Sequence, residues 1–318
     1  MTQICQRTKP ALVLMVAVMV VSCSHQAVMT RSIGSTKDSG TGNVGVMVMA
    51  HGGSEEWNAA VREAVLPLRT VWPVAIAFGM ADPSSLQTAV DELEEQQVDR
   101  IVVVRMFLSG KSFLHQTEYL LGFRPDPPET FTRHGTAMEN MSSNVYSLNG
   151  HHPPPSPIQS RAQIELIQEG LLDSPVCGTI LAERLSALSR VPEEESVLIL
   201  AHGPGDDEDN DLWLERMDRF AAEARNLGSF HRVRVETLRE DWPEKRRPAE
   251  ERIRSFAEQE QAEGKRLIVI PFRVYGFGPY ADVLHDLVYL SDGRGLLPHD
   301  LITEWLNSQI LKTIEPAG

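Results

Sequence analysis

The sequence is poor in cysteine, in aromatic residues and in positive charge, and each shortage excludes a class of protein. Of its three cysteines only Cys177 lies beyond the first 23 residues, so the body of the chain has no internal disulfide and no thiolate metal cluster. Aromatic residues make up 6% of the chain, which does not favour a stacking platform for single-stranded nucleic acid or sugars. A net charge of −14 argues against any nucleic-acid partner.

The remaining composition is that of a soluble globular protein. Apolar residues account for 42% and charged residues for 23% of 318 residues, a length typical of two ordinary domains. Cys177 directly precedes an apolar, helix-like run that includes Ile180, Leu181 and Leu185. We therefore expect this thiol to behave as a small buried hydrophobic group.

The first 23 residues are typical of an export signal. Arg7 and Lys9 precede an uninterrupted apolar run, and the run ends at Ser22-Cys23, which resembles a bacterial lipobox. We expect residues 1–23 to be a signal peptide and the protein to be an exported lipoprotein, anchored to the membrane only through lipid and facing the periplasm or cell exterior. A buried N-terminal strand or an uncleaved anchor helix is the alternative. Residues 24–43 are rich in Ser, Thr and Gly, which predicts a flexible tether.

Residues 44–124 alternate between short apolar runs and helical patterns. This alternation predicts βαβ units around a parallel sheet. The expected strands are Val46–Ala50, Val74–Phe78 and Ile101–Val104, and the expected helices are Trp57–Leu68 and Ser84–Gln96.

Residues 125–170 lose this pattern and are rich in proline. They predict a linker or a long surface excursion. The pair His151-His152 within them could hold a metal weakly, although solvated linker histidines are the more ordinary interpretation.

An internal repeat is the most informative feature. Val46 to Gly52 and Val197 to Gly203 are both apolar strands followed by Ala-His-Gly, and the strands Ile101–Val104 and Leu267–Ile270 both run into a glycine-containing loop. The repeat predicts an α/β protein of two tandem domains, residues 44–124 and 171–318, each a parallel sheet flanked by helices. We expect the two domains to face each other across a cleft.

Histidine follows the first strand of each copy, as His51 and His202. In open parallel sheets ligands bind beyond the carboxyl ends of the strands, and neutral imidazole binds divalent transition metals. The loop after Ile101–Val104 leads to His115 and Glu118, which share one face if a helix begins near Ser112. His51, His115 and Glu118 could thus converge on a divalent ion. The alternatives are a histidine bonded into its own loop and a solvated glutamate.

Several of these motifs, in this order, resemble the class II metal chelatase family, which includes sirohydrochlorin cobaltochelatases and ferrochelatases. They are the strand ending in His51-Gly52, the helix start Pro83-Ser84-Ser85-Leu86, the strand ending in Phe107-Leu108-Ser109, and, in the second half, Ala201-His202-Gly203-Pro204 and Gly276-Phe277-Gly278-Pro279-Tyr280. The resemblance extends over most of the chain after residue 43 and implies the tandem two-domain form with chelatase-like domains.

The resemblance implies an enzyme, a lyase of the cobaltochelatase or ferrochelatase type. It would insert Co²⁺ or Fe²⁺, as a substrate, into sirohydrochlorin or a related tetrapyrrole, without an organic cofactor. His51, His115 and Glu118 would be both the catalytic and the metal-binding residues. His115 stands two residues farther from Phe-Leu-Ser than in the family, and Lys111 takes the ligand position of other relatives.

The acidic side chains of a tetrapyrrole require cations at the rim of the site, for which Lys111, Arg105 and Arg124 are the candidates. In the second copy Ala281 stands where His115 would be, so we expect that copy to be mainly structural. The acidic run Asp206–Asp209 is interpreted as a solvated helix start. The export signal favours a different function, an exported metal- or haem-binding lipoprotein without turnover.

Overall fold

The computed structural model describes residues 28–31, 43–133, 144–147 and 154–315. The predicted signal peptide with Cys23, most of the predicted tether and the pair His151-His152 lie outside these residues. Within them, no helix combines the length and the apolar character that crossing a bilayer requires.

A five-stranded sheet forms the first half of the molecule, in the order β1-β7-β4-β2-β3. All neighbouring strands run parallel except β1, which pairs antiparallel with β7. The strands β2 and β4 are buried along nearly their whole length, as their continuous apolar runs predict. The bounds are β1 Val28–Arg31, β2 Val44–Ala50, β3 Val74–Phe78, β4 Arg100–Met106 and β7 Gln163–Ile167.

Helices connect the parallel strands, and their first residues explain where they begin. Ser54 caps α1 by accepting a hydrogen bond from the Trp57 backbone, and Asp82 caps α2 in the same way before Pro83. The helices of this half are α1 Glu55–Val65, the 3₁₀ turn η1 Leu66–Thr70, α2 Pro83–Glu95 and α3 Leu114–Leu120. The strands and helices predicted between residues 44 and 106 are thus present.

Two strands of this sheet lie in segments predicted to be irregular. β1 falls within the predicted tether, and β7 falls within the predicted linker of residues 125–170. β7 belongs to the sheet because Ile164, Leu166 and Ile167 are buried in the core, while Glu165 forms an ion pair with Arg100 at 2.7 Å. The same predicted linker contains a separate two-stranded hairpin of β5 Thr130–Arg133 and β6 Asn144–Ser147.

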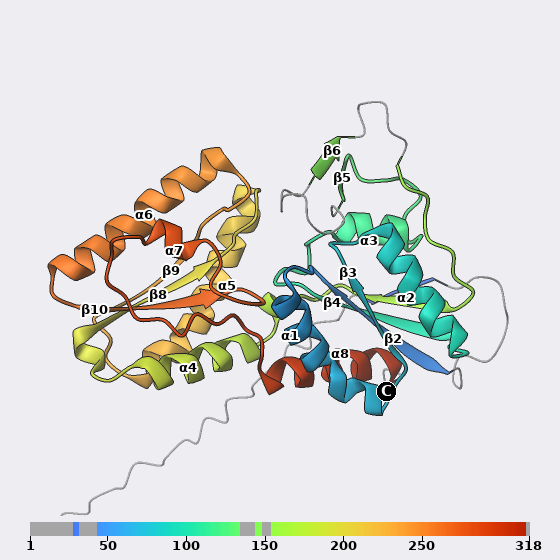
Figure 1. Cartoon of the computed structure of the whole chain (residues 1–318), viewed down its shortest axis with the longest axis horizontal. Coiled ribbons are helices and arrows are strands. Elements are labelled where there is room, and N and C mark those ends of the chain that lie inside the picture. The colour runs from blue at the N-terminus through green and yellow to red at the C-terminus, as the bar shows by residue number, and fades with distance from the viewer. Residues whose placement is uncertain (1–27, 32–42, 134–143, 148–153, 316–318) are drawn as a thin grey trace, which may run out of the picture.

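The second half contains a parallel three-stranded sheet in the order β10-β8-β9, which matches the order β4-β2-β3 of the first half. His51 and His202 therefore follow strands that occupy the same place in their sheets, as the repeat predicted. Figure 1 shows the two sheets side by side, each covered by helices. The bounds are η2 Leu171–Asp173, α4 Val176–Leu188, η3 Pro192–Glu194, β8 Glu195–Ala201, α5 Asp207–Leu227, β9 Arg232–Thr237, α6 Pro243–Ala262, β10 Arg266–Phe272 and α7 Tyr280–Val283.

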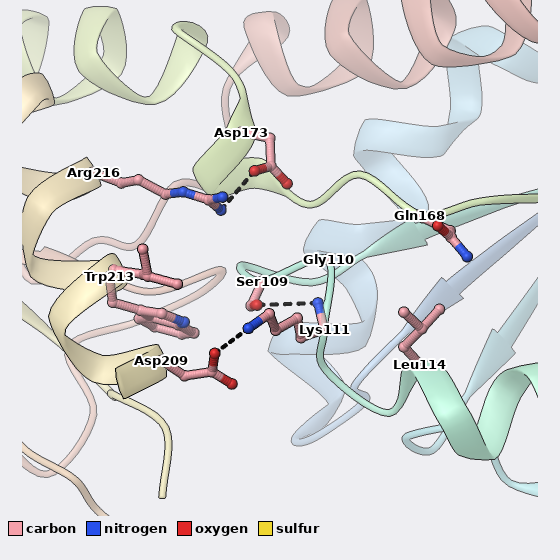
Figure 2. A pocket seen from close by; sticks show the side chains of 10 residues that line it. Ser109, Gly110, Lys111, Leu114, Gln168, Asp173, Asp209, Trp213 and Arg216 are labelled. Carbon is pink, nitrogen blue, oxygen red and sulfur yellow. Dashed lines mark hydrogen bonds and ion pairs between the residues drawn. The ribbon is translucent and has the colours of Figure 1, made fainter. Parts of the chain in front are cut away.

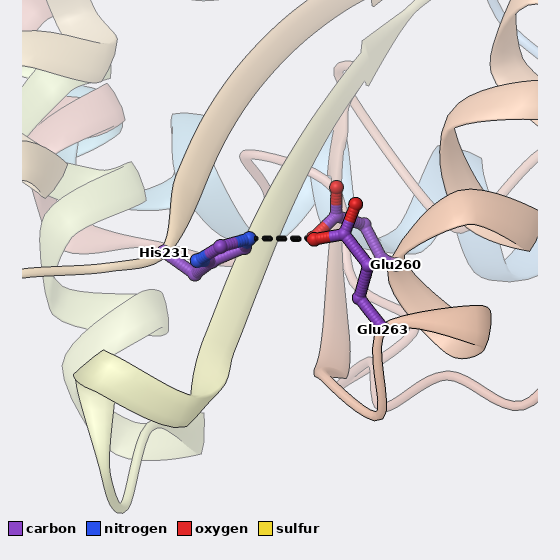
Figure 3. A group of neighbouring side chains, drawn as sticks. All are labelled: His231, Glu260 and Glu263. Carbon is purple, nitrogen blue, oxygen red and sulfur yellow. Dashed lines mark hydrogen bonds and ion pairs between the residues drawn. The ribbon is translucent and has the colours of Figure 1, made fainter.

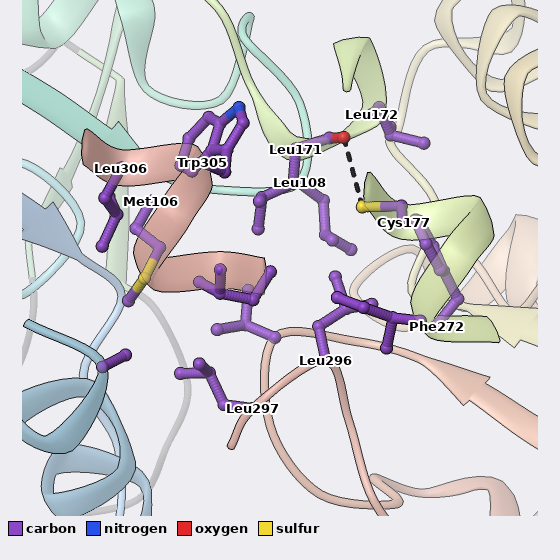
Figure 4. Close-up of a cluster of buried hydrophobic side chains, with 14 of the residues drawn as sticks. Met106, Leu108, Leu171, Leu172, Cys177, Phe272, Leu296, Leu297, Trp305 and Leu306 are labelled. Atoms are coloured by element: carbon purple, nitrogen blue, oxygen red, sulfur yellow. Dashed lines mark hydrogen bonds between the residues drawn. The ribbon is translucent and has the colours of Figure 1, made fainter. Parts of the chain in front are cut away.

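The last helix, α8 (Asp300–Ile314), returns to the first half, where it packs against α1 and β4. One buried apolar cluster consequently extends through both halves, from Met106 and Leu108 through Trp305 to Phe272 (Figure 4). Cys177 lies in this cluster, as predicted. Its sulfur hydrogen-bonds the Leu171 carbonyl at 3.2 Å, and burial raises the pKa of the thiol.

Candidate functional site

The two repeated histidines adopt the same local conformation at their strand ends. The glycines after them, Gly52 and Gly203, have φ angles of 75° and 78°, which favour glycine. The ring nitrogen Nδ1 lies 2.7 Å from the Gly52 carbonyl in His51 and 2.6 Å from the Gly203 carbonyl in His202. Because a carbonyl can only accept, Nδ1 carries the proton in both rings. Nε2 is then the nitrogen that a metal would bind.

The second half supplies a carboxylate to its histidine. Nε2 of His202 lies 2.9 Å from Oδ2 of Asp241, a residue in the turn between β9 and α6. Burial alone would lower the pKa of His202, but the hydrogen bond to Asp241 and the charges of Glu240 and Asp241 raise it above its usual value. With acceptors at both ring nitrogens, the charged form of His202 is favoured, and the ring must be neutral before it can accept a proton or bind a metal.

The pKa of Asp241 is also influenced by a residue of the first half, His51. The hydrogen bond from His202 lowers its pKa, burial opposes this, and the nearby positive charges of His202, His51 and Arg273 lower it further. His51 and His202 thus lie near the same carboxylate from opposite halves. Aromatic rings also connect the two halves here. The ring centroid of Trp57 lies 5.6 Å from that of His51 and 6.0 Å from that of Tyr275, which belongs to the second half.

Glu240 and Arg273 complete the second-half side of the site as an ion pair. Glu240 and Asp241 are not among the site residues predicted from the sequence. A signal was present nonetheless. The two acids come three and four residues after the end of a parallel strand, β9, whose carboxyl end opens on the same edge of the sheet as the end of β8.

The predicted partners of His51 lie elsewhere. His115 is exposed in the first turn of α3. The carboxylate of Glu118 is 10% exposed, accepts a hydrogen bond from Gln168 at 3.1 Å and lies 4.0 Å from Arg124. In the described residues, no group of three or more metal-ligating atoms within 4.8 Å of one another contains His51, His115 or Glu118, and none contains His202 or Asp241. The structure therefore does not bring these three together, and their joint metal binding stays a prediction.

Arg105, predicted to contact the substrate, instead uses its guanidinium to bind backbone carbonyls of its own chain. Its side chain is almost fully buried, and it donates to the carbonyls of Gly110, Ser112 and Gln168. Burial lowers the pKa of Arg105 to about 10, while the charges of Glu118 and Asp173 act in the opposite direction. A substrate carboxylate would have to break these bonds, so Arg105 shapes the loop after β4 instead of binding a ligand.

Lys111 does lie at a cavity between the two halves (Figure 2). The cavity has a volume of about 220 Å³ and is bordered by the loop after β4 and by the first turns of α5. Two ion pairs lie among the residues that line it, from Lys111 to Asp209 between the halves and from Arg216 to Asp173 within the second half. The ring of Trp213 adds an apolar wall. Asp209 belongs to the acidic run that was predicted to be a solvated helix start, and it forms an ion pair with Lys111 of the first half.

Comparison with known proteins supports the fold. No protein-family model and no curated protein matches the sequence. Among solved structures, SirB from Bacillus subtilis, solved with Fe³⁺, aligns with a TM-score of 0.55 and 12% identity over 86% of this chain and 96% of its own. A multi-domain protein from Deinococcus radiodurans, described as structurally similar to chelatases with two additional novel domains, aligns with a TM-score of 0.50 and 16% identity.

The second alignment covers 85% of this chain and 55% of the Deinococcus protein, so the chain spans about half the length of that relative. At these identities the similarity concerns the fold. The α/β architecture, with two largely parallel sheets flanked by helices, is a chelatase-like fold.

Proposed function

We propose that this chain inserts a divalent metal, Co²⁺ or Fe²⁺, into sirohydrochlorin or a related tetrapyrrole. The observation that carries the proposal is that His51 of the first half lies close enough to act electrostatically on Asp241, the carboxylate that pairs with His202 in the second half, in a chelatase-like fold. An imidazole that presents the metal, opposite an imidazole–carboxylate pair that takes up protons, suits a metal that must be bound and then released. The site would be shared by the halves, which differs from our expectation that the second half is mainly structural.

Metal insertion requires both delivery of the metal and removal of protons, and different residues of this site would perform the two. Two pyrrole protons must leave as the metal enters the macrocycle, and the metal must shed part of its water. His51 would present the metal through Nε2. His202, once deprotonated, would accept a pyrrole proton, and Asp241 would stabilise the imidazolium that forms.

The cations near the junction would orient the acidic macrocycle. Lys111 is the best placed of the predicted three, since its side chain is 63% exposed and it lines the cavity between the halves. Arg124, 32% exposed, would serve at the edge of α3 if the substrate reaches it. Arg105 is excluded by its own hydrogen bonds.

The test is anaerobic incubation of the protein with sirohydrochlorin and Co²⁺ or Fe²⁺, followed by absorbance. We expect His51→Ala to abolish insertion, and Asp241→Asn to slow it by about 10- to 100-fold, as the loss of a group that orients a ligand does. His285→Ala is the matched control, because that side chain is 64% exposed and pairs with its neighbour Asp286. It should insert metal at the wild-type rate.

The outcomes separate the two candidate functions. Unchanged insertion by His51→Ala would contradict the proposed site. Binding of metal or macrocycle by the wild type without any change of absorbance that marks insertion would instead support the binding lipoprotein without turnover.

A further inference from the structure

A cluster of three side chains in the second half has the composition of a metal site. The Nε2 atom of His231 and one carboxylate oxygen each from Glu260 and Glu263 lie within 4.8 Å of one another (Figure 3). Nε2 of His231 is 2.9 Å from Oε2 of Glu263 and 4.0 Å from Oε2 of Glu260. Two ligands about 2.1 Å from a tetrahedral zinc ion lie about 3.4 Å apart, between these two separations.

The fold fixes all three groups. Glu260 and Glu263 are one turn apart at the end of α6 and therefore share a face. His231 immediately precedes β9, where its backbone N–H bonds the Glu195 carbonyl at 2.8 Å. The Glu260 side chain is fully buried, while those of His231 and Glu263 are 30% and 35% exposed. A metal could thus enter from solvent to a ligand set anchored in the core.

The two oxygens of each carboxylate have different partners. Arg232 binds Oε1 of Glu260 at 2.6 Å and Oε1 of Glu263 at 3.2 Å. Oε2 of both carboxylates faces His231, and Oε2 of Glu260 also accepts from the Ser196 hydroxyl. Arg232 therefore orients the carboxylates from the far side without occupying the oxygens toward which the imidazole points, as outer partners of metal ligands do.

The charge of the cluster favours a cation. Two carboxylates and one guanidinium leave a net charge of −1 when His231 is neutral. An imidazole with two carboxylates suits Zn²⁺ or Co²⁺ and leaves a fourth position for water.

We propose that His231, Glu260 and Glu263 form a second divalent-metal site, with Zn²⁺ as its typical occupant. The site lies at the amino ends of β8 and β9, beside Ser196 and His231, whereas the proposed insertion site lies at their carboxyl ends. A metal here would join the start of β9 to the end of α6. It would stabilise the second half as a resident ion, distinct from a metal that is inserted and released.

The test is titration of the metal-free full-length chain with Zn²⁺ by calorimetry, in the wild type and in His51→Ala. In each background, adding His231→Ala should reduce the number of bound Zn²⁺ ions by one. Adding Glu263→Gln should weaken the affinity for that ion at least tenfold, although the glutamine keeps a hydrogen-bonding partner for His231. Glu258→Gln is the control, since Glu258 lies on the same helix with its side chain 53% exposed. It should bind as its parent does.

Thermal unfolding provides the second measurement. Zn²⁺ should raise the melting temperature of His51→Ala but not of the same variant carrying His231→Ala, while the melting temperatures without metal establish that both are folded. An equal number of zinc ions bound with and without His231 would overturn the proposal. Because the readout is zinc binding, this result is independent of whether the chain inserts metal into a tetrapyrrole.

Discussion

His51 and His202 show how two identical motifs acquire different properties. Each ring is fixed by the carbonyl of the glycine that follows it. The carboxylate of Asp241 lies at hydrogen-bonding distance from His202, although it is 39 residues away in the sequence. The Ala-His-Gly repeat could therefore predict where both histidines lie but not the carboxylate that stands beside His202.

The pair His202–Asp241 predicts a defined pH response. Because its folded-state pKa is raised, His202 contributes stability that is fully present below its unfolded pKa of about 6.5 and is lost as pH rises through the folded value. Asp241, with a lowered pKa, contributes stability that is lost as pH falls through its folded value. The ion pair is therefore complete only between these two folded-state pKa values, and metal insertion, for which neutral His202 must accept a proton, should become faster as pH rises through the upper one.

Asp241→Asn tests this response. The variant should lower the pKa of His202, as followed by the NMR shift of its ring protons, and should move the midpoint of pH-dependent metal insertion to lower pH. The change in stability should be small, since the Asp241 side chain is 56% exposed and solvent screens the pair. Asp218→Asn, at an equally exposed acid on α5, is the control. An unchanged His202 titration in Asp241→Asn would refute the role of the pair.

At the scale of elements, periodicity predicted the buried strands well and the irregular segments poorly. β2, β3, β4 and α2 follow the expected ranges closely, because apolar runs and helix caps are local signals. β7 was hidden by the proline-rich sequence before it, and its central Glu165 interrupts the apolar run. That charge is accommodated only because Arg100, on the neighbouring strand, binds it.

The loop after β4 offers the clearest prediction at this scale. Arg105→Met removes the guanidinium that binds the carbonyls of Gly110, Ser112 and Gln168, and it leaves partly buried acceptors without donors. We expect a loss of about 2–4 kcal/mol in the free energy of unfolding, measured with urea. Arg219→Met, at a side chain that is 69% exposed, should change it by less than about 0.5 kcal/mol. Equal stability of both variants would contradict this structural role of Arg105.

At the scale of the whole molecule, the repeat predicted two units, but the chain closes them into one. The apolar cluster of the first sheet continues into the second sheet without a break. α8 is the last element of the chain, yet it packs against α1 and β4 of the first half as well as α4 of the second. No local pattern in residues 300–314 indicates which sheet the helix covers, because that depends on the surface left open by the other elements. The relative position of the halves, and with it the approach of His51 to Asp241, depends on this shared core.

Trp305 on α8 tests whether the halves are energetically one unit. Its side chain is 3% exposed within the shared cluster, so Trp305→Ala should cost about 3–5 kcal/mol. Because the core is continuous, urea unfolding should remain a single transition that shifts to lower concentration, with far-UV circular dichroism and tryptophan fluorescence coincident. Leu66→Ala, at a side chain that is 62% exposed, should leave the transition nearly in place. Separate transitions for the two probes in the wild type would mean that the halves unfold independently and that α8 does not couple them.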